Sequence, residues 1–163
     1  MNSTALLGGL AGAATVTLIH ESIKKVVPQA PRMDLLGMST LDKGLKKASL
    51  DGLSNNQLYV AAMAGDLLTN GLYYALAGAG KPKNIWVRST LLGVAAGVSA
   101  VLLPGPLGLN EKHSNRTTAT AFMTIGLYVT GALVSAAVIK LLQKKDSKKE
   151  VEWERRLVTS SMG

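Results

Sequence analysis

Apolar residues gather in four long runs along this chain, and polar, lysine-rich segments separate them. The runs cover residues 4–20, 58–79, 85–103 and 118–142. A bilayer core about 30 Å thick is crossed by roughly 20 residues of helix. The first run is short, but its helix can continue into the following turn. We therefore predict an all-α integral membrane protein, a single domain with four transmembrane helices in a compact bundle.

A weaker helical pattern lies in the long connection between the first two runs. Its apolar positions recur at intervals of three and four residues: Met38, Leu41, Leu45 and Ala48. Charged residues fill the positions between them, which predicts a short amphipathic helix on the membrane surface over about residues 33–53. A helix folded over the mouth of the bundle fits the pattern equally well. Within this segment, the sequence STLD at 39–42 resembles a capping box with Asp in the acidic position.

Composition supports a membrane location and argues against nucleic-acid binding. Only 17% of the residues are charged, whereas soluble domains have about 25%. The net charge of +8 comes from lysines and arginines at the ends of the apolar runs, where membrane proteins carry them. Aromatic residues make up 4% of the chain and do not alternate with basic ones, so no nucleic-acid partner is expected. With no cysteine, disulfides and thiolate chemistry are excluded.

The distribution of basic residues predicts the orientation. In a four-span topology, the second connection and the polar tail (143–163) hold ten lysines and arginines when the flanking Arg88 and Lys140 are counted with them, against eight in the other two connections. The positive-inside rule then places both termini of a multi-pass protein in the cytoplasm. Lys24 and Lys25 follow the first run rather than precede it, so we expect a retained span and not a signal peptide. Tyr59, Trp86 and the pair at 73–74 are expected at membrane interfaces.

The second apolar run contains an aspartate near its middle. Helical spacing places Asp66, Thr69, Asn70 and Tyr73 on one face as a polar stripe about ten ångströms long. A charged group at mid-membrane costs about 3 kcal/mol, so this stripe is expected to face the bundle interior or a water-filled cleft.

Two interpretations of the Asp66 stripe remain open. Asp66 can be structural glue, protonated or paired with a neighbouring helix, and Arg88 and His20 are its candidate partners. Alternatively, the stripe lines a path for a solute or for protons.

A second polar cluster follows the first run. His20 and Glu21 end that run, and Arg32 and Asp34 open the surface segment. These side chains supply an acid, a base and a cation if the bundle brings them near Asp66, and they are ordinary interfacial charges if it does not. Glu21 is adjacent to His20 and is expected to point elsewhere on the helix. The two histidines lie in separate segments, so we predict no metal site and no cofactor.

Small residues recur four positions apart on three of the runs. The pairs are Gly8 and Gly12, Gly93 and Gly97, and Gly131 and Ser135. Such faces let membrane helices approach closely. They are expected to pack the helices within one chain, and a dimerisation face is the alternative.

No catalytic signature stands out, which shapes the functional expectation. The favoured hypothesis is a non-enzymatic accessory or scaffold protein in the lipid bilayer, with a homo-oligomer or another membrane protein as its partner. The first alternative is a small channel or transporter for a solute or protons that uses Asp66. The second is a membrane-embedded enzyme that acts on lipid through His20, Glu21, Arg32 and Asp66.

Overall fold

The computed structural model describes residues 2–50 and 52–160. Helices make up 81% of the protein, and the described residues contain no strand. The elements are α1 (Ser3–Val26), α2 (Met33–Lys47), α3 (Asn55–Ala75), the 3-10 turns η1 (Leu76–Gly78) and η2 (Pro82–Asn84), α4 (Ile85–Leu102), α5 (Lys112–Asn115) and α6 (Thr118–Ser160). The all-helical prediction is confirmed.

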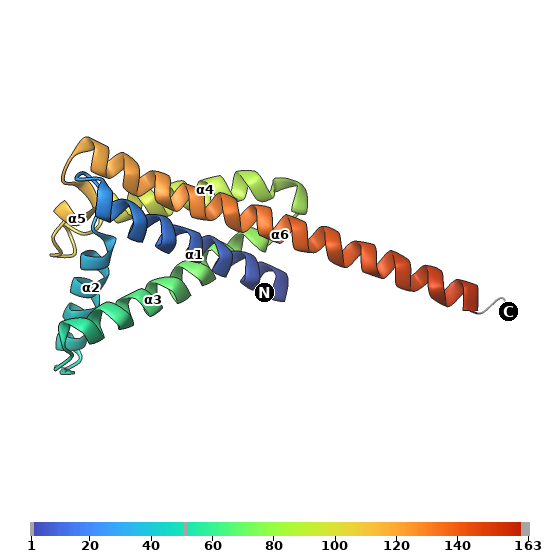
Figure 1. Ribbon diagram of the computed structural model, residues 1–163, viewed down its shortest axis with the longest axis horizontal. Coiled ribbons are helices and arrows are strands. Elements are labelled where there is room, and N and C mark those ends of the chain that lie inside the picture. The colour runs from blue at the N-terminus through green and yellow to red at the C-terminus, as the bar shows by residue number, and fades with distance from the viewer. Residues whose placement is uncertain (1, 51, 161–163) are drawn as a thin grey trace.

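The four predicted runs correspond to α1, α3, α4 and α6, which alternate in direction (Figure 1). Helices α1 and α6 pack together at the centre, with α3 on the other side of α1 and α4 on the other side of α6. Helix α2 lies across the end of the bundle where α1 ends and α3 begins (Figure 1). Helix α6 continues past the opposite end, so the tail predicted at 143–163 is helical as far as Ser160.

Three helical segments are long and apolar enough to cross a membrane: Ser3–Val26, Pro82–Leu102 and Thr118–Lys145. This is consistent with a membrane protein. Helix α3 is not among them, because Asp66 and Asn70 lower its hydropathy although its length of 21 residues is sufficient.

Helix ends differ from the sequence pattern at two places. Residues 39–42 do not begin a helix, because α2 has already started at Met33 and contains them. Helix α2 ends at Lys47, whereas the predicted end was residue 53. Two residues after Lys47, Ser49 adopts a left-handed conformation with φ of 58°, which a right-handed helix does not contain. The capping box lies instead at the start of α3, where the Ser54 and Gln57 side chains each accept from the other's backbone N–H.

The small residues identified in the sequence all pack inside the chain. A Cβ atom added to Gly12 would lie 2.3 Å from the carbonyl oxygen of Gly131, and one on Gly8 would lie 3.0 Å from that of Ser135. On α4, Cβ atoms at Gly93 and Gly97 would meet the α6 backbone at 2.7 Å. These faces therefore bring α1 and α4 against α6, and they are not free to form a dimer interface.

Tyr74 is inside the bundle rather than at an interface. Its side chain is fully buried, and its hydroxyl donates to the Tyr128 carbonyl oxygen at 3.1 Å. A buried tyrosine needs such an acceptor for its hydroxyl group. The interfacial position expected for this residue is therefore wrong, and Tyr74 instead holds α3 against α6.

Candidate functional site

An open cleft of about 730 Å³ lies between α3 and α4, with α6 as its floor. Helix α2 and the segment at 103–109 close one end, where the Lys43 ammonium donates to the Leu107 carbonyl oxygen at 2.6 Å. At the other end, the Tyr73 hydroxyl crosses from α3 to donate to the Leu92 carbonyl oxygen of α4 at 3.0 Å. The cleft has the size of a small-molecule site.

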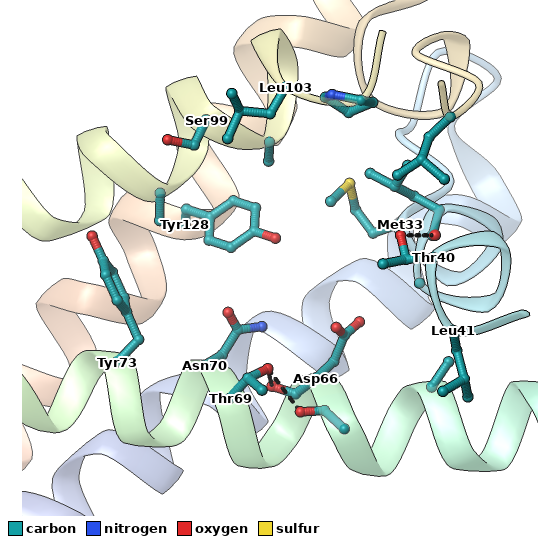
Figure 2. Close-up of a pocket in the computed structure, with 18 of the residues that line it drawn as sticks. Met33, Thr40, Leu41, Asp66, Thr69, Asn70, Tyr73, Ser99, Leu103 and Tyr128 are labelled. Atoms are coloured by element: carbon teal, nitrogen blue, oxygen red, sulfur yellow. Dashed lines mark hydrogen bonds between the residues drawn. The ribbon is translucent and has the colours of Figure 1, made fainter. Parts of the chain in front are cut away.

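The polar stripe of α3 forms one wall of this cleft. Asp66 and Asn70 point from α3 into it, and the ring of Tyr128 reaches toward them from α6 (Figure 2). The Thr69 hydroxyl donates to the Gly65 carbonyl oxygen of its own helix at 2.7 Å. The structure thus places all four predicted stripe residues at the cleft.

Among the described residues, no hydrogen bond reaches the Asp66 carboxylate, the Asn70 amide or the Tyr128 hydroxyl. The partners considered for Asp66 are engaged elsewhere. Arg88 donates to the Ala77 carbonyl oxygen at 2.8 Å, where it secures η1. His20 contacts the backbone between α1 and α2. The contacts expected of structural glue are therefore not found at Asp66.

The rest of the cleft is mostly apolar. Alanines and leucines predominate: Leu36, Leu41, Ala61, Ala62, Ala95, Ala96, Ala100, Leu103, Leu107 and Leu109. Of the described residues that line it, Asp66 is the one carboxylate and none is basic. Apolar walls with a few convergent polar groups are typical of ligand sites. The arrangement can hold a molecule that is largely apolar and carries a positive charge or a hydrogen-bond donor.

The second polar cluster does come together, at the end of the bundle beside α2. Asp34 lies 3.0 Å from both the Lys24 ammonium and the Arg32 guanidinium, and Lys24 lies 2.6 Å from Glu21. Neither His20 nor Arg32 lines the large cleft. The cluster is thus an ionic network that joins α1 to α2, and the clustering around a lipid-facing cleft that the enzyme hypothesis needs is not observed.

Asp34 remains ionised in this network. Burial favours its protonated form, but hydrogen bonds from Arg32 and Lys24 outweigh burial and hold the pKa of Asp34 well below its ordinary value of 3.8. Its side chain is 5% exposed. A buried charge with two cationic partners is expected to fix the angle between α1 and α2.

Glu21 differs from its sequence-based prediction. One of its carboxylate oxygens lies 3.5 Å from Nδ1 of His20, although the two residues are adjacent. The same carboxylate oxygen accepts a hydrogen bond from the Lys24 ammonium at 2.6 Å, three residues further along α1. Among the described residues, no group of three or more histidines and acidic side chains is placed to hold a metal.

Two parts of the site are absent from the sequence-based prediction. Tyr128 lies in an apolar run and carries no local signal, and the closure of the cleft by Lys43 joins residues 64 positions apart.

In comparisons with protein-family models, curated proteins and solved structures, nothing matches this chain.

Proposed function

We propose that this protein is a four-span membrane protein that binds a small amphiphilic organic cation in the cleft between α3 and α4, as the solute site of a carrier. The observation that carries the proposal is the Asp66 carboxylate, which has no hydrogen-bond partner among the described residues and lies in a cleft with mostly apolar walls. An ionisable group at mid-membrane is characteristic of solute pathways.

The chemistry of the lining favours a cation over an anion or a sugar. Asp66 supplies a negative charge, and none of the described residues in the lining is basic and able to neutralise it. The rings of Tyr73 and Tyr128 add faces that attract positive charge. An anion would be repelled, and a sugar would leave the alanine-rich walls uncovered.

The accessory-protein hypothesis has less support, for two reasons. It uses Asp66 to bond helices, and no such bond is found among the described residues. Its dimerisation face would need the small-residue pairs, which are occupied within the chain. No contact among the described residues identifies another surface for a partner.

Binding of tetraphenylphosphonium to the purified full chain in nanodiscs tests the proposal. We expect Asp66→Asn to weaken binding by about tenfold or more, because the amide keeps the shape of the side chain and removes its charge. Asp42→Asn is the matched control, since Asp42 pairs with Lys46 on the outside of α2 and does not line the cleft. Unchanged affinity in Asp66→Asn would contradict the proposal.

The four-span topology makes a separate prediction that cysteine labelling can check. Because the chain has no cysteine, single replacements at Ser3, Ser49 and Ser147 each introduce one exposed thiol. In intact cells, a membrane-impermeant maleimide is expected to label Ser49→Cys, and to label the other two only after permeabilisation. If Ser3→Cys and Ser147→Cys lie on opposite sides, α3 does not span.

A further inference from the structure

A second, smaller cavity lies between Asp66 and the ionic network. Its volume is about 30 Å³, which leaves room for at least one water molecule. Side chains from four helices line it, including His20 of α1, Asp34 of α2, Asp66 of α3 and Tyr128 of α6. Because Asp66 and Tyr128 also line the large cleft, the two spaces meet at Asp66.

His20 has a backbone partner for each neutral form of its ring. Nε2 lies 3.0 Å from the Pro31 carbonyl oxygen and 3.2 Å from the backbone nitrogen of Met33. The first contact needs a proton on Nε2, and the second needs a lone pair there, so one form of the ring cannot make both. A histidine supported in both forms can accept a proton at one nitrogen and release one from the other.

The other ring nitrogen faces a route to solvent. Nδ1 of His20 lies 3.5 Å from the Glu21 carboxylate, within reach of a hydrogen bond after a small side-chain movement. The His20 side chain is 6% exposed, whereas that of Glu21 is 25% exposed. From the large cleft to the solvent beside α2, the order is therefore Asp66, the small cavity, His20 and Glu21.

We propose that His20 and Glu21 carry protons between Asp66 and the solvent at the α2 end of the bundle, so that binding of the cation releases a proton there. This inference rests on the proposed function of the cleft. A cation pairs with the ionised carboxylate, and a proton held by Asp66 must therefore leave as the cation binds.

The transfer is balanced at each atom. The Asp66 carboxyl gives its proton to water in the small cavity, and that water gives a proton to Nε2 of His20. The Nδ1 proton of His20 passes to the Glu21 carboxylate, and then to solvent. The ring thereby moves from the form that accepts from Met33 to the form that donates to Pro31. Release of the cation reverses every step, so the ring needs no rotation.

Among the described residues, seven charged or titratable groups surround this route, and Asp34 is the one that could compete with Glu21 for the proton from His20. They are Glu21 and Lys24 on α1, Arg32 immediately before α2, Asp34 on α2, Tyr59 and Asp66 on α3, and Tyr128 on α6. Asp34 touches the cavity, but Arg32 and Lys24 keep it ionised with a pKa well below its usual range. It therefore holds no proton at neutral pH, and Glu21 is the acceptor next to solvent.

Stopped-flow mixing of the full chain in nanodiscs with tetraphenylphosphonium tests the route. A dissolved pH indicator in weak buffer reports proton release between about pH 5 and 9, while a parallel titration reports affinity. We expect up to one proton per bound cation. His20→Asn and Glu21→Gln are expected to bind with unchanged affinity and to release the proton about tenfold more slowly. Added imidazole is expected to restore the rate in His20→Asn, because it carries protons in place of the ring.

His113→Asn is the matched control, since His113 lies in α5 and lines neither space. Cation binding without proton release at every pH would overturn the inference and leave the proposed function standing. Unchanged rates in both variants, or slow release that imidazole does not restore, would also overturn it. If His20→Asn does not fold, the rate of proton release in Glu21→Gln alone tests the route. Absence of cation binding to the wild-type chain would instead contradict the proposed function, and this inference with it.

Discussion

Replacing Gly12 with alanine is expected to lower the free energy of unfolding by about 3 kcal/mol, because overpacking a tight contact costs 1–3 kcal/mol and occasionally more. The new Cβ atom would lie 2.3 Å from the Gly131 carbonyl oxygen and 3.0 Å from the Ser135 Cβ atom. The first of these is a backbone atom that cannot rotate away. Helices α1 and α6 must therefore separate, and the Tyr128 floor of the cleft moves with α6. Unfolding of the purified protein in mixed micelles measures the effect.

Gly126→Ala and Gly65→Ala are controls for this substitution. Both glycines are helical, and a Cβ atom at either would meet nothing within 4 Å outside its own helix. These variants are expected to be as stable as the wild type or more so, since alanine is favoured over glycine in helices by about 1 kcal/mol. If Gly12→Ala behaves like the controls, α1 and α6 do not approach as closely as described.

The stripe and the cluster were predictable because both depend on spacing along one helix or one short connection. Asp66, Asn70 and Tyr73 share a face by helical periodicity alone. His20 lies near the end of α1 and Asp34 near the start of α2, and one short connection joins the two helices. Their proximity follows from the change of chain direction at that connection. The apolar runs likewise predicted where the helices lie, to within a few residues for α4.

The cleft itself was not predictable from these patterns. It exists because small residues draw α1 and α4 onto α6, which leaves α3 and α4 with few mutual contacts and a space between them. That outcome depends on contacts between distant segments, as does the position of Tyr128 in the floor. The helical period of α2 predicted an amphipathic helix, but whether it rests on the bilayer or closes a cleft depends on the distant Leu107 carbonyl that Lys43 reaches.

Glu21 shows a limit of periodicity. Adjacent helical positions diverge by about 100° at the backbone, which is why Glu21 was expected to point away from His20. A long side chain can nevertheless bend toward the side chain of the adjacent residue, as Glu21 does toward Nδ1 of His20. Here Lys24 binds both Glu21 and Asp34, and Asp34 lies 4.0 Å from Nε2 of His20. The network therefore surrounds the histidine from its own helix and from α2.

Replacing Asp34 with asparagine is expected to destabilise the protein by on the order of 3 kcal/mol at neutral pH, as is usual when one member of a buried ion pair is removed. The change leaves the 13% exposed Lys24 ammonium with Glu21 as its one carboxylate partner among the described residues, beside the Tyr59 ring. Asp42→Asn is the control, because the Asp42–Lys46 pair is solvent-exposed and worth at most about 1 kcal/mol.

The same substitution predicts a pH dependence. Because the pKa of Asp34 is lower in the folded than in the unfolded chain, its stabilisation is fully present above its ordinary value of 3.8 and is lost as the pH falls further. Wild type and Asp34→Asn should therefore differ at neutral pH and converge in acid, when Asp34 becomes protonated and uncharged. Unfolding titrations of both proteins at several pH values measure this convergence. A difference that persists unchanged in acid would mean that Asp34 acts through its shape and hydrogen bonds rather than its charge, and the ionic account of the α1–α2 junction would then be wrong.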